Sequence, residues 1–196
     1  MPMKGPEYLP GHYYHFYNRS AHRISIFREA DNCLFVLRKM KTYCRSLALT
    51  PIAYCLMPNH YHFLIRQDGE KRAGLLPQRA FNSYSKAYNK RYGHSGTLFE
   101  GNYRVILVEN EAHLLHLCRY IHANPVKHGL VADLVEWPYS NYLEWIGERD
   151  GTLVDRDFVR EHFASAQSHR EFVLDYLVRR ELPEELEAYL SAWEQW

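Results

Sequence analysis

The chain has 196 residues, of which 46% are hydrophobic and 24% are charged, a composition typical of one soluble globular domain with room for an appendage. No apolar run approaches the roughly 20 residues that span a bilayer, and no apolar stretch follows the first residues, so we expect neither a membrane segment nor a signal peptide. Four cysteines without a CxxC pair predict reduced, mostly buried thiols in a cytoplasmic protein, which excludes the disulfide-framed and zinc-knuckle classes: Cys33, Cys44, Cys55 and Cys118.

The net charge of +1 conceals a strong asymmetry along the chain. Residues 1–130 carry 18 Lys and Arg against 8 Asp and Glu, whereas residues 131–196 carry 6 against 15. A basic body favours a polyanionic partner such as nucleic acid. Packing of the acidic part on the basic part explains the same pattern, and composition leaves both interpretations open.

The first half of the chain predicts three strands and one long helix. Residues 13–18 alternate aromatic and polar character, which is typical of a strand. Residues 51–57 and 60–66 form two further strands, hairpinned through Pro58-Asn59. Between them and the first strand, residues 29–48 predict an amphipathic helix. The apolar side chains at helical spacing in that helix are Leu34, Leu37, Met40 and Cys44.

The next segments complete an alternating pattern of strands and helices. A second helix is predicted over 75–92, and residues 97–108 read as extended, with an interruption at Gly101. A third helix begins at Asn110 or Glu111 and is expected to stop where Asn124-Pro125 follows Ala123. The order β-α-β-β-α-β predicts an α+β, ferredoxin-like split βαβ fold, an antiparallel sheet with helices on one face.

The character of the chain changes after Gly129. From Asp155 onward two or three short helical patterns follow, broken near Ser168 and Pro183. We therefore predict a catalytic domain over residues 1–146 and an acidic helical extension over residues 147–196.

Two histidines on the third strand form the sharpest local feature. Because side chains alternate along a strand, His60 and His62 share one face and Tyr61 and Phe63 share the other. Two imidazoles in this arrangement can chelate a divalent metal ion, while the aromatic pair packs under the helices. The alternative is a pair of ordinary surface histidines in a histidine-rich chain, and the HxH pattern alone does not decide.

A tyrosine and an asparagine share one face of the third predicted helix. Tyr120 and Asn124 are four residues apart, and Leu117 and Ile121 anchor a neighbouring face to the core. Opposite a two-histidine strand, the phenol and the amide would complete a metal site with a nucleophile beside it. A helix-capping Asn124 beside a half-buried Tyr120 is the alternative that this segment by itself favours.

Together these features resemble the single-tyrosine HUH transposases, and more closely the REP-associated tyrosine transposases. The resemblance covers residues 12–146 and departs at Asn102, where a basic residue commonly follows the glycine. The matching stretches are Tyr14-His-Phe-Tyr-Asn-Arg19, Ala53-Tyr-Cys-Leu-Met-Pro-Asn-His-Tyr-His-Phe-Leu-Ile65, Ser95-Gly-Thr-Leu-Phe-Glu-Gly101, Arg119-Tyr-Ile-His-Ala-Asn-Pro-Val-Lys127 and Trp137-Pro-Tyr-Ser-Asn-Tyr142.

This resemblance implies metal-dependent cleavage and rejoining of single-stranded DNA, with a REP-type hairpin as target and a 5′-phosphotyrosine intermediate. By position, Tyr120 takes the role of the nucleophile, and His60, His62 and Asn124 take the roles of ligands to Mg²⁺ or Mn²⁺. The fold of the family agrees with the strand order predicted above. No small-molecule cofactor and no membrane partner are expected.

Basic side chains across the body are candidates for gripping the DNA backbone, although about half of them are expected to be solvated surface charges. A tyrosine stripe on the second helix, at Tyr84, Tyr88 and Tyr92, suits base stacking or, equally simply, core packing. The candidate cations are Arg19, Arg23, Arg66, Arg79, Lys86, Lys90, Arg91, Arg104 and Lys127.

Two other functions compete with the transposase. A hairpin-binding module that has kept the fold and lost cleavage is one, although retention of all four site residues argues against it. An unrelated HxH metalloenzyme is the other, and the long helices argue against it. The short connection at 109–111 favours a site assembled within one chain. The acidic extension either shields the DNA site or forms a remote helical cap.

Overall fold

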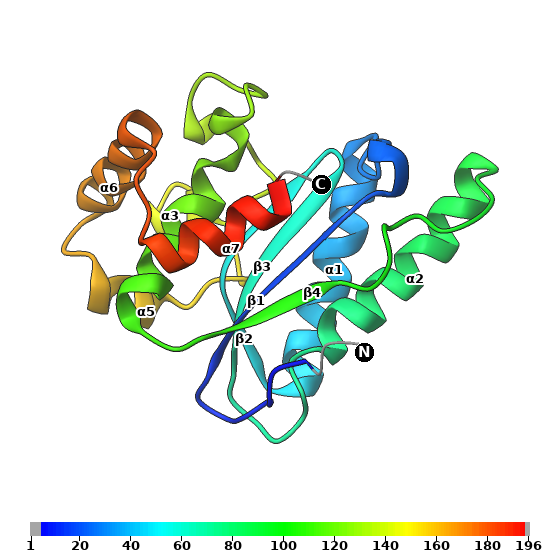
Figure 1. Ribbon diagram of the computed structural model, residues 1–196, viewed down its shortest axis with the longest axis horizontal. Coiled ribbons are helices and arrows are strands. Elements are labelled where there is room, and N and C mark those ends of the chain that lie inside the picture. Colours follow the sequence, from blue (N-terminus) through cyan, green and yellow to red (C-terminus); the bar gives the residue numbers. More distant parts are fainter. Residues whose placement is uncertain (1–4, 195–196) are drawn as a thin grey trace.

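The computed structural model describes residues 5–194, and side chains through residue 192. At its centre lies a four-stranded antiparallel sheet in the order β2-β3-β1-β4 (Figure 1). Its strands are β1 (Tyr13–Arg19), β2 (Leu49–Met57), β3 (His60–Gln67) and β4 (Arg104–Val108). Because β1 pairs with both β3 and β4, the two halves of the split βαβ unit interlock, which confirms the predicted ferredoxin-like fold.

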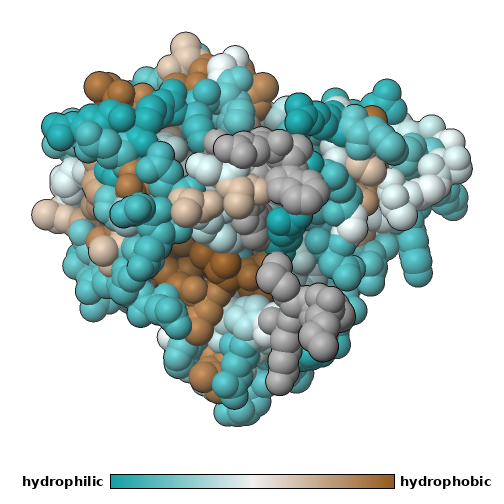
Figure 2. All heavy atoms as spheres, in the orientation of Figure 1, coloured by the Kyte–Doolittle hydropathy of each residue, from teal (hydrophilic) through white to brown (hydrophobic). Residues whose placement is uncertain are grey.

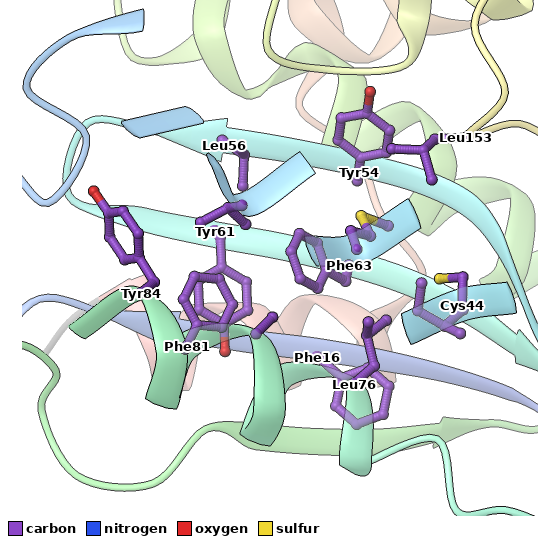
Figure 3. Close-up of a cluster of buried hydrophobic side chains, with 14 of the residues drawn as sticks. Phe16, Cys44, Tyr54, Leu56, Tyr61, Phe63, Leu76, Phe81, Tyr84 and Leu153 are labelled. Carbon is purple, nitrogen blue, oxygen red and sulfur yellow. The ribbon is translucent and has the colours of Figure 1, made fainter. Parts of the chain in front are cut away.

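Two long helices, α1 (Ala30–Leu47) and α2 (Leu75–Tyr92), cover one face of the sheet. Figure 3 shows the core between them, where Tyr61 and Phe63 of β3 point toward Phe81 of α2. The rings of Tyr61 and Phe81 stack with centroids 3.9 Å apart. Placement of this aromatic pair under the helices confirms that the opposite face of β3 presents the two histidines.

The buried stripe of α1 differs by one position from the prediction. Leu34 is 43% exposed, and Cys33 and Val36 are buried in its place, ahead of Met40 and Cys44. At 3.6 residues per turn, Cys33 lies within about 20° of Met40 and Cys44 around the helix axis, whereas Leu34 lies about 80–120° away from them. Helical spacing therefore favours Cys33 as the buried residue, as the structure has it.

The opposite face of the sheet carries α3 (Glu111–Lys127) and the C-terminal helices. The second core that they enclose includes Phe158, Val173, Tyr176, Leu186 and Leu190, so residues beyond 147 contribute apolar side chains to it. The remaining elements are η1 (Ala21–Arg23), η2 (Leu134–Glu136), α4 (Tyr142–Trp145), α5 (Arg156–His162), α6 (Ala166–Arg179) and α7 (Glu184–Glu194).

Helix α3 does not stop at Asn124-Pro125, as predicted, but continues to Lys127 with Pro125 inside it. Proline lacks an N–H, so it removes one hydrogen bond of the helix. The turn after it still closes, because the backbone N–H of His128 donates to the carbonyl of Asn124 at 3.0 Å. With Pro125 buried in the last turn, packing outweighs the lost bond.

Two smaller differences concern element boundaries, and a third predicted boundary is confirmed. The predicted break near Ser168 lies earlier, because Ser165 caps α6 by accepting a hydrogen bond from the Ser168 N–H. The predicted break at Pro183 is confirmed, since α7 begins at Glu184. Of the extended stretch over 97–108, only Arg104–Val108 is a strand. The segment before it turns at Gly101, whose φ of 76° suits glycine.

The tyrosine stripe of α2 faces the core. Tyr84 and Tyr88 are buried, and their hydroxyls donate to the backbone carbonyls of Ile26 and Ser25. This confirms the core-packing interpretation of the stripe. The four cysteines are buried free thiols, as expected.

Neither the visible surface (Figure 2) nor the helices suggest a membrane-spanning segment within the described residues. In the orientation of Figure 2 the face is mostly hydrophilic, with apolar residues gathered in one patch near its centre. Over residues 5–194, no helix is both long and apolar enough to cross a membrane.

Candidate active site

Strands β1 and β3 bring the histidines of the HxH pattern next to side chains of the first strand. In the antiparallel register Tyr17 lies opposite His62 and Arg19 lies opposite His60. Directly opposed residues project to the same face of a sheet, and the diagonal neighbours, here His15 and His62, are also within reach. A row of polar side chains therefore forms on the face that α3 covers.

These side chains line a cavity of about 230 Å³. Residues of β1 and β3, Tyr120 of α3 and Leu190 of α7 all contribute to its lining. A larger cavity, of about 660 Å³, lies between α2 and the 101–103 loop and contains neither the two histidines nor Tyr120. The lining residues of the smaller cavity are His15, Tyr17, Arg19, Arg23, Asn59, His60, His62, Tyr120, His128 and Leu190.

His62 is held in a single orientation. Its Nδ1 lies 3.1 Å from Nε2 of His15, and its ring is 2% exposed. Burial lowers the pKa of His62 well below its ordinary value and lowers the pKa of His15 to about 3, so both rings are neutral near pH 7. The Nε2 atom of His62 is buried and has no hydrogen-bond partner among the described residues. A neutral imidazole with an unoccupied lone pair is the form that binds metals.

Tyr120 lies against His62 of the same chain. The two rings meet edge to face, with centroids 5.4 Å apart, and Tyr176 packs against Tyr120 at 6.1 Å. The Lys127 ammonium lies 4.8 Å from the centroid of the Tyr120 ring. A connection of only two residues, Glu109-Asn110, joins β4 to α3. Tyr120 and His62 therefore meet within one chain.

Asn124 is fully buried one helical turn after Tyr120, and it does not line the cavity. Its Nδ2 donates to the Tyr120 carbonyl at 2.8 Å, a bond within the helix. Its Oδ1 has no hydrogen-bond partner in the part of the chain that the structure describes. A buried amide oxygen without a donor is uncommon and invites a functional explanation.

Several predicted cations gather at the cavity. Arg19 and Arg23 line it, Lys127 covers Tyr120, and Arg104 lies opposite Tyr17 in the sheet register. Arg19 also forms an ion pair with Glu100, which lowers the pKa of that carboxyl through a hydrogen bond. Arg23 and its neighbour His22 have φ values of 56° and 58°, left-handed conformations that are strained in residues other than glycine.

The remaining predicted cations lie elsewhere. Arg66 pairs with Asp68 and Asp155, and Arg91 pairs with Glu29 and Asp31. Three others, Arg79, Lys86 and Lys90, are exposed on α2, on the other face of the sheet. The structure thus divides the predicted set into four cations near the cavity and five away from it.

Five lining residues were not selected as site residues from the sequence: His15, Tyr17, Asn59, His128 and Leu190. His15 and Tyr17 alternate on β1 as His60 and His62 do on β3, which is a usable signal once the pairing of the two strands is known. His128 and Leu190 carry no local signal, because α3 was predicted to end before His128 and α7 is distant in sequence.

The sequence of this chain matches a known protein family. The family described as IS200-like transposases matches residues 9–124, which span all four strands and reach Asn124. The chain belongs to this family. The match ends before α4 to α7, so the C-terminal helices lie outside the part that defines family membership.

One curated protein and two solved structures are similar to this chain. A Haemophilus influenzae protein named as a REP-associated tyrosine transposase is 28% identical over 113 residues, which covers 52% of this chain and 64% of that protein. The structure of a REP-associated tyrosine transposase bound to a REP hairpin aligns with a TM-score of 0.60 and 17% identity, over 80% of this chain and 98% of that one. A crystal structure described as a transposase from Deinococcus radiodurans aligns with a TM-score of 0.42 and 17% identity, over 60% of this chain and 94% of that one.

Proposed function

We propose that this chain cleaves and rejoins single-stranded DNA through a covalent bond to Tyr120, with a hairpin of the REP type as its substrate. The observation that carries the proposal is that Tyr120 lines the same cavity as His60 and His62. Membership of the IS200-like transposases and the likeness to a hairpin-bound relative support it. The hairpin preference comes from that relative and is a proposal for this chain.

In the proposed reaction, the phenol oxygen of Tyr120 attacks the scissile phosphorus and releases its proton to water, and the departing 3′ oxygen takes up a proton from water. The bond to the 3′ oxygen breaks, leaving a 3′-hydroxyl on one strand and a 5′-phosphotyrosine on the protein. A later 3′-hydroxyl reverses the step and restores the phenol, so no external energy source is needed. Covalent catalysis thereby divides one difficult displacement into two easier ones.

The residues at the cavity suit a divalent cation. His60 and His62 lie one pleat apart, and Nε2 of His62 is buried without a hydrogen-bond partner within residues 5–192. The unpartnered Oδ1 of Asn124 is an oxygen ligand of the kind that Mg²⁺ and Mn²⁺ accept. Among the described residues, no group of three or more His, Cys, Asp or Glu side chains is arranged as a metal site, so a third ligand would have to be of another type. The family resemblance assigns this role to Asn124, although its side chain is buried outside the cavity. A bound Mg²⁺ or Mn²⁺ would supply Lewis-acid polarisation of the scissile phosphate.

The four cations near the cavity are proposed to hold the DNA backbone. Arg19 and Arg23 line the cavity beside the histidines, so a phosphate placed against Tyr120 meets positive charge there. Lys127 over the Tyr120 ring favours the developing phenolate, because opposite charges attract strongly in a buried site. Orientation and electrostatics are thus supplied by side chains of the chain itself.

The test is formation of a covalent adduct. A labelled hairpin with a single-stranded 5′ extension is incubated with the protein and Mn²⁺, and the protein is separated under denaturing conditions. We expect an adduct with the natural chain, none with Tyr120→Phe, and an undiminished one with Tyr92→Phe, a half-buried tyrosine on the other face of the sheet. His60→Ala is expected to abolish cleavage while hairpin binding persists.

Three results contradict the proposal in different ways. An adduct that survives Tyr120→Phe shows that another residue is the nucleophile. Tight hairpin binding with no adduct in the natural chain indicates the non-catalytic binding module instead. Cleavage that survives both His60→Ala and His62→Ala shows that the two histidines do not hold a required metal ion.

A further inference from the structure

A path of hydrogen bonds runs from the C-terminal helix to the cavity. The hydroxyl oxygen of Tyr189, on α7, lies 3.3 Å from Nδ1 of His15, and Nε2 of His15 lies 3.1 Å from Nδ1 of His62. His15 is completely buried and His62 is 2% exposed, so bulk water does not compete for these nitrogens. The path ends at His62 Nε2, the buried atom that has no hydrogen-bond partner within the described chain.

The direction of these bonds decides what His62 can do. A neutral imidazole carries one proton, so the ring nitrogen that donates leaves the other nitrogen with a free lone pair. If His15 holds its proton on Nδ1 and donates to Tyr189, its Nε2 accepts the Nδ1 proton of His62. His62 Nε2 is then a lone pair available to a cation. In the reverse assignment, the Tyr189 hydroxyl donates to His15 and His15 donates to His62, whose own proton then lies on Nε2 and blocks the ligand atom. That proton would be buried with no acceptor among the described residues, and an unsatisfied buried donor is costly, which favours the first assignment.

We propose that Tyr189 is a positioning residue that, through His15, keeps the proton of His62 on Nδ1 and so leaves Nε2 as a metal ligand. The inference rests on the proposed function, because it assigns a purpose to the metal site proposed there. A partner on the remote nitrogen of a ligating histidine generally fixes its tautomer and raises its affinity. Tyr189 lies outside residues 9–124, the part of the chain that matches the family. In this proposal α7 therefore adds a residue to the site from outside that part.

The first experiment measures binding of Mn²⁺ alone by isothermal titration calorimetry. Tyr189→Phe removes only the hydroxyl and keeps the ring against His15, whose ring centroid lies 5.9 Å away. We expect the affinity to fall about tenfold, the lower end of what loss of such a partner causes. Tyr43→Phe, a half-buried tyrosine of α1 on the opposite face of the sheet, is the matched control and is expected to bind as the natural chain does.

The second experiment reads the tautomer directly in the metal-free protein. Nitrogen–proton correlation spectra of the histidine rings are expected to place the His62 proton on Nδ1 in the natural chain and in Tyr43→Phe. In Tyr189→Phe a substantial fraction of that proton is expected on Nε2. Either an unchanged tautomer or an unchanged Mn²⁺ affinity in Tyr189→Phe overturns the inference, and circular dichroism verifies that each variant is folded.

The outcomes separate this inference from the proposed cleavage. If the natural chain forms the hairpin adduct and Tyr189→Phe binds Mn²⁺ as tightly as the natural chain does, the role of Tyr189 is overturned. The proposed cleavage reaction then still stands. Weakened Mn²⁺ binding in Tyr189→Phe, with no adduct from the natural chain, supports the role of Tyr189 and overturns the cleavage. A natural chain that binds no Mn²⁺ overturns the metal site, and this inference with it.

Discussion

Two buried histidines join α3 to α6 and make the stability of this interface depend on pH. His122 Nε2 donates to Asn141 Oδ1 at 3.0 Å, so its Nδ1 accepts from His169 Nε2 at 3.1 Å. A proton added to His122 Nδ1 would face the N–H of His169. Burial lowers the pKa of His122 to about 4, and burial together with His122 lowers the pKa of His169 well below its ordinary value.

The sign and size of the effect follow from linkage. A histidine with a depressed folded pKa contributes stability that is present above its unfolded pKa, near 6.5, and is lost as the pH falls toward the folded value. For a folded pKa well below 5, the loss between pH 7.5 and pH 5 is set by the unfolded pKa and amounts to at most about 2 kcal/mol for each ring. The pair therefore removes up to about 4 kcal/mol of unfolding free energy over this range.

The assay is urea unfolding at pH 7.5, 6 and 5, comparing the natural chain with His169→Gln. Glutamine keeps an N–H donor for His122 and does not titrate, so the drop in unfolding free energy between pH 7.5 and pH 5 should shrink by up to about 2 kcal/mol. His12→Gln, at a histidine that is exposed to solvent, controls for the loss of a ring. An equally steep pH dependence in His169→Gln and the natural chain refutes the reasoning.

Three further predictions concern salt, the C-terminal helices and the thiols. Hairpin affinity, measured by fluorescence anisotropy, should fall with rising salt, and Arg23→Gln should reduce the slope of log affinity against log salt by about 0.7. An unchanged slope would show that Arg23 does not contact the DNA. Truncation after Gly147 deletes Phe158, Val173 and Tyr176 from the second core. We expect an insoluble product, because loss of each of these side chains costs roughly 2–5 kcal/mol of stability. A folded truncation that cleaves faster would instead support shielding of the site by the C-terminal helices. Burial raises the pKa of Cys33 and Cys44 to about 12, so Ellman's reagent should report no thiol until urea unfolds the chain, and rapid labelling of the native protein would contradict this.

Much of the fold follows from patterns within single segments. Alternation over the residues around His60 and His62 separates the histidine face of β3 from the aromatic face, because a strand has a side-chain period of two. The spacing of Tyr120 and Asn124 places them on one turn of α3 for the same kind of reason. The end of α3 was mispredicted because the cost of one lost hydrogen bond at Pro125 is local, whereas the packing that outweighs it is not.

The order of strands and helices and the two faces of β3 follow from the sequence, since each depends on the period of single elements. The role of Tyr120 as candidate nucleophile was indicated only by the family resemblance. The neighbours of the site were decided only by tertiary structure. His15 reaches His62 because β1 pairs with β3, and Tyr189 reaches His15 because α7 folds back over the sheet, 174 residues along the chain (Figure 1). Such contacts depend on which surfaces bury the most apolar area together, a property of the whole chain that no local pattern contains.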